Sequence, residues 1–204
     1  MRIFIALPLP PDFLEQAEED LRILRDMYPH WRWVTEVNLP LHITLAFLGE
    51  LDDREAVLAQ QALTQAVRDE SPIAFDTESA ILLPKSAHRG NGRVDFHRVN
   101  TLALEIAHGA ERIAGLATRF EDALAETGKR EGYPFRPKEK RQYTPHITLA
   151  RKGNKGSIPA ETAGEPFPVK TTGMAETAAL FKSDLSGGGR GAGPRYTPLG
   201  IYLL

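Results

Sequence analysis

The sequence predicts an α+β fold, one domain over residues 1–204 built as two lobes whose helices cover the outer faces of the sheets. Short segments of alternating apolar residues, typical of strands, are mixed with longer segments whose apolar residues recur every three or four positions, typical of helices. Several strand segments follow one another directly, which favours hairpin-like pairs. The pentapeptide His-Ile-Thr-Leu-Ala occurs at 42–46 and again at 146–150, which indicates two related structural units.

The first part of the chain alternates strands and helices. The predicted elements are, in order, a strand over 3–7, a helix over 10–27, an extended segment over 31–34, a strand over 41–48 and a helix over 52–68. Prolines at the start of the first helix suit its first turn. Asp52 and Asp53 are candidate caps for the second helix, because an aspartate side chain accepts hydrogen bonds from the first amides of a helix.

The second part is richer in strands. The predicted elements are strands over 73–83 and 93–99, a helix over 106–124, a basic loop over 129–141, and strands over 143–151, 174–181 and 196–203. The helix is the clearest of the sequence, since its apolar residues repeat at steps of four and three until Gly128 stops it. The glycine-rich stretch 187–193 predicts a mobile loop.

Composition excludes several classes of protein. Hydrophobic residues make up 42% of the 204 residues and charged residues 25%, which is typical of a soluble globular protein. No apolar run is long enough to cross a bilayer, and the start of the chain reads as a strand, so we expect a cytoplasmic protein that does not contact membranes. The sequence has no cysteine, which excludes disulfide scaffolds and thiol nucleophiles. With a net charge of −2, any recognition of phosphate must be local.

The repeated pentapeptide carries the chemistry. Side chains in a strand alternate between faces, so His42 and Thr44 point one way while the intervening isoleucine and the following leucine point to the core. The same alternation puts His146 beside Thr148. If a pseudo-twofold axis relates the two units, both pairs converge on one cleft.

Two histidines and two threonines around one point suit displacement at phosphorus. A neutral imidazole accepts a proton from the attacking oxygen while a charged imidazole donates one to the leaving oxygen. Threonine hydroxyls can hydrogen-bond the oxygens on which negative charge builds. This arrangement requires neither a metal nor another cofactor.

Other interpretations are weaker. A lone histidine is usually structural, and we read His30, His88, His97 and His108 in that way. Zinc is disfavoured because neither pentapeptide holds a carboxylate and threonine is a poor zinc ligand. No Gly-x-Ser-x-Gly elbow of a serine hydrolase occurs, and the stretch 187–193 lacks the Gly-Lys-Ser/Thr ending of a phosphate-binding loop.

Two long signatures resemble a known family. Residues 41–50, Leu-His-Ile-Thr-Leu-Ala-Phe-Leu-Gly-Glu, and residues 145–151, Pro-His-Ile-Thr-Leu-Ala-Arg, are similar to those of the 2H phosphoesterases. Within that superfamily the chain resembles the bacterial and archaeal RNA 2′,3′-cyclic phosphodiesterases, also called 2′-5′ RNA ligases. The resemblance implies two pseudo-symmetric lobes with antiparallel sheets lining a central cleft.

The same resemblance implies an activity and residue roles. It implies metal-independent hydrolysis of an RNA 2′,3′-cyclic phosphate end to a 2′-phosphate. His42 would be the proton donor to the departing 3′-oxygen and His146 the proton acceptor from water, while Thr44 and Thr148 would hold phosphate oxygens. The reverse reaction would join RNA ends through a 2′-5′ linkage.

One cation of the family pattern is missing. The position of Ala46 is often lysine in these proteins, and strict alternation places it on the face of His42. Arg151, also a family position, is the candidate replacement. Strict alternation turns Arg151 away from His146, so the strand would have to bend.

Aromatic residues near the motifs are candidates for contact with a base. Tyr143 and Phe47 either stack on a base or pack in the core. The loop 129–141 mixes basic and aromatic residues, so it is either an RNA contact or a solvated charged loop.

The expected partner is an RNA that ends in a 2′,3′-cyclic phosphate, bound by a monomer. Two other functions stay open. The chain could be a phosphodiesterase that acts on 2′-5′ oligonucleotides or small cyclic nucleotides, or a module that binds RNA ends without catalysis.

Overall fold

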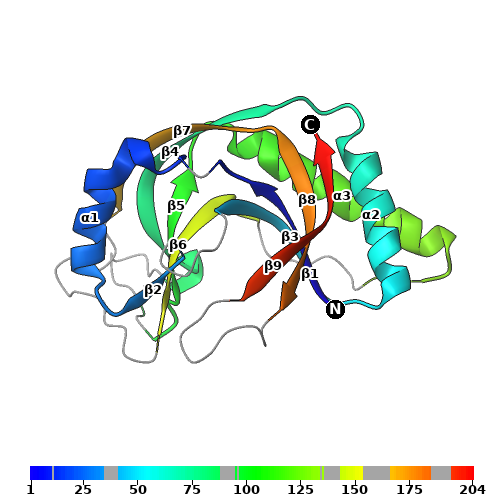
Figure 1. Ribbon diagram of the computed structural model, residues 1–204, viewed down its shortest axis with the longest axis horizontal. Helices are drawn as coiled ribbons and strands as arrows, with labels where there is room; N and C mark the ends of the chain where they lie inside the picture. Colours follow the sequence, from blue (N-terminus) through cyan, green and yellow to red (C-terminus); the bar gives the residue numbers. More distant parts are fainter. Residues whose placement is uncertain are drawn as a thin grey trace.

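The computed structural model describes residues 1–10, 12–34, 41–87, 95, 97–133, 135, 143–153, 166–184 and 194–204 (Figure 1). The glycine-rich stretch 187–193, residue 88 and most of the predicted loop 129–141 lie outside these ranges. Within them, no helix is both long enough and apolar enough to span a membrane.

The described strands form one nine-stranded sheet in which every pair is antiparallel. They are β1 Arg2–Pro8, β2 Trp31–Trp33, β3 His42–Glu50, β4 Ile73–Leu83, β5 Thr101–Ile106, β6 His146–Lys152, β7 Phe167–Ala175, β8 Thr177–Asp184 and β9 Arg195–Leu203. The order is β7-β4-β5-β6-β3-β1-β8-β9, and β2 also pairs with β6.

This order is symmetric about the central pair of β3 and β6. β1 lies beside β3 as β5 lies beside β6, and two further strands extend the sheet on each side. The chain connects β1 to β3 through a helix and connects β5 to β6 through another. The predicted α+β class with two related units is confirmed, and the two sets of strands join through one residue pair.

The helices are α1 Glu18–Met27, α2 Asp53–Val67 and α3 Ala110–Arg130, with short 3-10 turns η1 Glu15–Ala17 and η2 Lys85–Ala87. Figure 1 shows α1 at one end of the sheet and α2 and α3 together at the other. The N-terminus of α2 confirms the predicted cap. The Asp52 side chain accepts from the Glu55 amide at 2.8 Å, and the Glu55 side chain accepts from the Asp52 amide at 2.7 Å.

Four predicted elements have other bounds, and Gly128 does not stop the third helix, since α3 continues to Arg130. Asn100 and the described part of 93–99 precede a strand that runs over 101–106, so Ile106 ends β5 and does not start the helix. The helix starts after Gly109, which has φ +77° and whose added Cβ would lie 2.4 Å from the carbonyl oxygen of Ala74. The segment 174–181 divides between β7 and β8, and the helix over 10–27 is regular only from Glu18.

The sheet buries its two faces unequally. Ile3, Ile5 and Leu7 of β1 are fully buried in the main core, which the helices cover. The alternate residues Phe4 and Ala6 belong to a second, small cluster with Ala179, Phe181 and the partly buried Tyr196. β1 is therefore covered on both faces, as its nearly continuous apolar sequence indicates.

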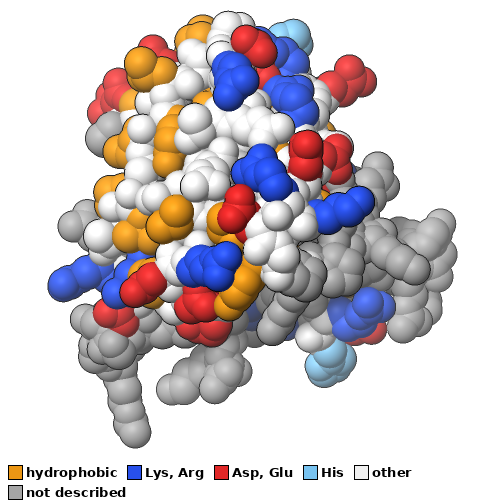
Figure 2. Space-filling model, turned by 90° about the vertical axis from the view of Figure 1, so that its right-hand side faces the viewer, with side chains coloured by type: hydrophobic (Ala, Val, Ile, Leu, Met, Phe, Trp, Pro, Cys, Tyr) orange, Lys and Arg blue, Asp and Glu red, His pale blue; other side chains and the backbone are white. Residues whose placement is uncertain are grey.

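Charges of both signs cover the side of the molecule that includes α2. Figure 2 shows Lys and Arg side chains interspersed with Asp and Glu over this face, together with scattered hydrophobic side chains. The described residues of this face form no continuous basic surface, which agrees with the net charge of −2.

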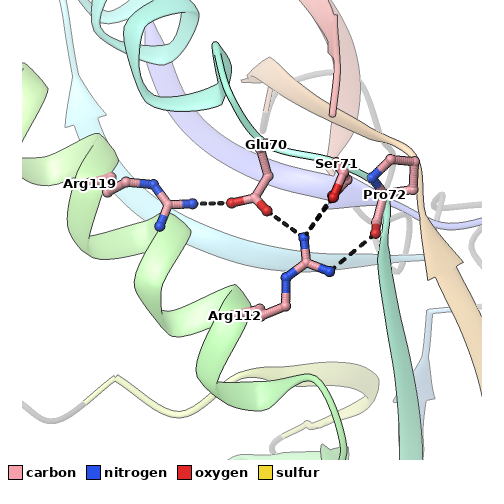
Figure 3. Close-up of polar contacts among 5 residues, drawn as sticks. All are labelled: Glu70, Ser71, Pro72, Arg112 and Arg119. Atoms are coloured by element: carbon pink, nitrogen blue, oxygen red, sulfur yellow. Dashed lines mark hydrogen bonds and ion pairs between the residues drawn. The ribbon is translucent and has the colours of Figure 1, made fainter.

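An ion-pair network fastens α3 to the segment between α2 and β4 (Figure 3). The side chain of Glu70 is only 11% exposed and accepts hydrogen bonds from Arg112, at 2.5 Å, and from Arg119. Arg112 also donates to the carbonyl oxygens of Ser71, at 3.0 Å, and Pro72, at 3.3 Å. One carboxylate thus joins two turns of α3 to the backbone that enters β4.

Replacing Glu70 with glutamine is expected to lower the free energy of unfolding by about 1–2 kcal/mol, because the amide keeps one acceptor oxygen. One arginine then loses its acceptor and the other loses its ionic partner, although both are half-exposed. Urea denaturation of the wild type and the variant measures the change. Glu126→Gln, at an exposed position within the same helix, is the matched control. Equal stabilities of the Glu70 and Glu126 variants would show that the network contributes nothing.

Candidate functional site

The two copies of the repeated pentapeptide lie on the two central strands of the sheet. β3 and β6 pair at Ile43 and Ile147, and both isoleucines are fully buried. This register, continued by one residue in each direction, places each histidine opposite the threonine of the other copy. The two histidines are then diagonal neighbours, and such pairs lie about 7–8 Å apart across an antiparallel ladder.

Pairing with β1 defines which side chains of β3 share a face. His42, Thr44 and Phe47 oppose even-numbered residues of β1, whereas Ile43 and Ala46 oppose odd-numbered ones. The register shifts between Thr44 and Ala46, so β3 has a β-bulge there. The bulge moves Ala46 to the core side, where it packs against the main cluster, and turns Phe47 to the side of His42.

Pairing with β5 gives the same result for β6. His146, Thr148 and Arg151 oppose alternate residues of β5, and the register shifts between Thr148 and Ala150. This second bulge buries Ala150 in the main core and turns Arg151 to the side of His146. We call the shared side, with His42, Thr44, Phe47, His146, Thr148 and Arg151, the histidine face.

The bulges correct two expectations drawn from strict alternation. Ala46 does not lie on the face of His42, and Arg151 is not turned away from His146. Each bulge falls at the leucine of its copy, so Phe47 and Arg151 occupy equivalent positions in the two units. All four histidine and threonine side chains of the repeat are partly exposed, whereas the apolar residues between them are buried, as predicted.

The ring of His146 is oriented by the backbone. Its Nδ1 lies 2.8 Å from the carbonyl oxygen of Thr144, and since a carbonyl only accepts, Nδ1 carries the hydrogen. In the neutral ring the lone pair is therefore on Nε2. Across the ladder, Glu105 opposes His146 and forms an ion pair with Lys85.

Aromatic rings surround His42. Phe4 lies 5.3 Å from the His42 ring, and Tyr196 meets that ring edge-on at 5.6 Å. Phe4 also contacts Phe47 at 5.8 Å and stacks on Phe181 at 5.2 Å. Phe47 is 66% exposed, so core packing does not account for it, and one side of its ring is accessible to a planar ligand.

Tyr143 joins the two copies. Its hydroxyl donates to the carbonyl oxygen of Thr44 at 2.8 Å, and its ring packs against the main core. Burial raises the pKa of Tyr143, so this hydroxyl stays protonated and keeps donating. A residue three positions before the second copy thus holds the backbone of the first.

Arg151 is held on the histidine face by β5. Its guanidinium donates to the Thr101 hydroxyl at 2.5 Å, and burial lowers the pKa of Arg151. Tyr196 and Arg32 are its charged or titratable neighbours. Sequence reasoning missed Phe4, Tyr196 and Arg32 as part of this surface, since only the register of distant strands brings them together.

The described aromatic residues of the loop 129–141 contact α2 and the core. Tyr133 donates to Asp52 at 2.8 Å and lies under the guanidinium of Arg54, and Phe135 packs against the main cluster. The hydrogen bond with Asp52 raises the pKa of Tyr133. Within the described part of the chain, no group of three or more His, Asp or Glu side chains is placed to hold a metal ion.

Comparison with known proteins identifies relatives over the whole chain. Residues 10–173 match the family model described as the 2′-5′ RNA ligase superfamily. An RNA 2′,3′-cyclic phosphodiesterase of Thermus thermophilus is 30% identical, over 100% of this chain and 90% of the relative. A protein of the same name from Thermotoga maritima is 25% identical, over 89% of this chain and 92% of the relative.

Solved structures share the fold. The crystal structure of TT0787 of Thermus thermophilus matches with a TM-score of 0.69 and 26% identity, covering 100% of this chain and 98% of that one. Escherichia coli LigT, in a complex with 3′-AMP, matches with a TM-score of 0.63 and 24% identity, covering 100% and 97% of the two chains.

Proposed function

The chain belongs to the 2′-5′ RNA ligase superfamily of 2H phosphoesterases, and from this premise we propose that it hydrolyses the 2′,3′-cyclic phosphate at RNA ends to a 2′-phosphate. The observation that carries the proposal is the meeting of two His-x-Thr copies on the central strands of the sheet, with all four polar side chains on the histidine face. The relative at 30% identity bears the name of this activity.

The two imidazoles act as base and acid. With its Nδ1 hydrogen donated to Thr144, the neutral His146 presents Nε2 to a water molecule and takes its proton. The water oxygen bonds to phosphorus as the bond from phosphorus to the 3′-oxygen breaks. The charged His42 gives its proton to that oxygen, which leaves a 3′-hydroxyl and a 2′-phosphate.

The remaining residues bind the phosphate and the base. Thr44 and Thr148 donate to the two non-bridging oxygens, and Arg151 adds positive charge beside them. Phe47, exposed beside Phe4, stacks on a nucleobase. In ligation, the 5′-hydroxyl of a second RNA bonds to phosphorus in place of water as the bond to the 3′-oxygen breaks, so the same base and acid give a 2′-5′ linkage and a 3′-hydroxyl.

This chemistry requires no metal, because the two histidines transfer both protons and the hydroxyls and Arg151 stabilise the charge. Turnover of an oligonucleotide ending in a 2′,3′-cyclic phosphate is expected to be unchanged by EDTA and to show a bell-shaped dependence on pH. Product analysis should find only the 2′-phosphate.

Three results would contradict the proposal. Loss of activity in EDTA with recovery on adding a divalent ion would show metal catalysis. Tight binding of a 2′-phosphorylated end without turnover would show a binding module. Faster cleavage of internal 2′-5′ linkages or of small cyclic nucleotides than of RNA ends would assign the site to those substrates.

A further inference from the structure

We infer that Arg32 and Arg151, which oppose each other on β2 and β6, form a second anion subsite on the histidine face. Its ligand is the phosphodiester that precedes the reacting ribose in an RNA chain. The inference rests on the proposed function, because it assigns the neighbouring phosphate of the same substrate.

Strand pairing places Arg32 and Arg151 side by side, and Arg2 lies on the same face of the sheet. Arg32 of β2 lies directly opposite Arg151 of β6, and opposed residues share a face. Arg2 is two residues from Phe4 on β1, so it lies on the side of Phe4 and the histidines. Arg2 and Arg32 are exposed, while Arg151 is partly buried.

Tyr196 connects these residues to the histidine pair. It extends from β9, where it opposes Ser183 of β8. Its ring lies 4.8 Å from Phe4 and 5.6 Å from His42, both edge-on. The edge strand of one half of the sheet thus supplies an aromatic ring next to the acid of the proposed reaction.

Positive charge acts on the hydroxyl of Tyr196. Burial raises the pKa of Tyr196, and the positive charges of Arg151, Arg32 and Arg2 oppose the rise. Three guanidinium groups, from β6, β2 and β1, therefore act on a single phenol oxygen.

These like charges are not neutralised by an ion pair within the described part of the chain. Across the described residues, no carboxylate forms an ion pair with any of the three arginines. Glu50, which opposes Arg2, pairs with the N-terminal amine at 3.4 Å. A phosphate would relieve the repulsion, because guanidinium groups bind its oxygens with paired hydrogen bonds.

The spacing fits a neighbouring phosphate. Thr148 and Arg151 oppose Ala103 and Thr101, which are two residues apart on β5. Two strand residues span about 7 Å. Arg151 therefore lies about 7 Å along the sheet from Thr148, the threonine assigned to the reacting phosphate. This spacing suits the next phosphate of an extended RNA chain.

The test compares a nucleoside 2′,3′-cyclic phosphate with a dinucleotide that ends in the same group. The wild type is expected to prefer the dinucleotide, and Arg32→Gln to lower the ratio of the two kcat/KM values about tenfold. Arg195→Gln, beside Tyr196 but on the other side of β9, should keep the ratio. A dinucleotide with an uncharged methylphosphonate linkage should lose the preference in the wild type and show no further loss in Arg32→Gln.

An unchanged ratio in Arg32→Gln, or an equal loss of kcat/KM with both substrates, would overturn the subsite.

If the wild type turns over neither substrate, the proposed function fails, and measurements of binding then test the subsite. Calorimetry with a dinucleotide and a mononucleoside, each carrying a 2′-phosphate, should show a dinucleotide preference that Arg32→Gln removes. The slope of log K against log salt should also fall by about 0.7, as for one lost phosphate contact. Equal affinities of the wild type for both ligands would refute the subsite.

Discussion

Replacing either His42 or His146 with alanine is expected to lower kcat/KM for a 2′,3′-cyclic phosphate by about 10²- to 10⁴-fold, the usual contribution of one acid–base group. Without His146, water must lose its proton unaided; without His42, the 3′-oxygen must leave as an alkoxide. Both histidines are partly exposed, so their removal leaves no buried cavity and the variants should fold.

The pH dependence separates the two roles. In the bell-shaped profile of the wild type, one limb reports the base and the other the acid. His146→Ala is expected to lose the acidic limb and His42→Ala the basic limb, since each variant lacks the group that titrates there. His108→Ala, an exposed histidine in the turn before α3, is the control and should keep both the rate and the profile. If either alanine variant shows the unfolding transition of the wild type and also keeps the wild-type rate, the assignment of acid and base is wrong.

Alternation within the repeat was enough to predict the central pair of the site. Side chains alternate between the two faces of a strand, so His42 and Thr44 lie on the face opposite to the buried Ile43. The same pattern at His146 predicts a second, related strand. Burial of one face fixes this register, because a slip of one residue would expose the isoleucine. These inferences needed only neighbours along the chain.

The rest of the site depends on contacts between distant strands. The bulges at Leu45 of β3 and Leu149 of β6 each add one residue, and no local sequence signal distinguishes Leu-Ala in a bulge from Leu-Ala in a regular strand. Without the bulges, Arg151 could not be assigned to the histidine face. Tyr196 approaches His42 only because β8 and β9 extend the sheet beyond β1, a topology that local patterns do not contain.

The equivalence of the two units predicts that both threonines matter. Thr44→Val and Thr148→Val each preserve the shape of the side chain but remove the hydroxyl that donates to a phosphate oxygen. We expect each change to lower kcat about 10²-fold, the scale for losing one donor to a developing oxyanion. The two decreases in kcat should be of similar size, because each threonine lies two residues after its histidine and directly before its bulge.

Serine variants test whether the hydroxyl is responsible. Thr44→Ser and Thr148→Ser keep the donor and should recover most of the rate, whereas a loss caused by packing alone would not be recovered. Thr197→Val is the matched control, since Thr197 is an exposed strand threonine on the side of β9 opposite Tyr196. If only one threonine variant loses activity, the two copies do not bind the phosphate equivalently, and the pseudo-twofold symmetry of the sheet does not extend to the chemistry.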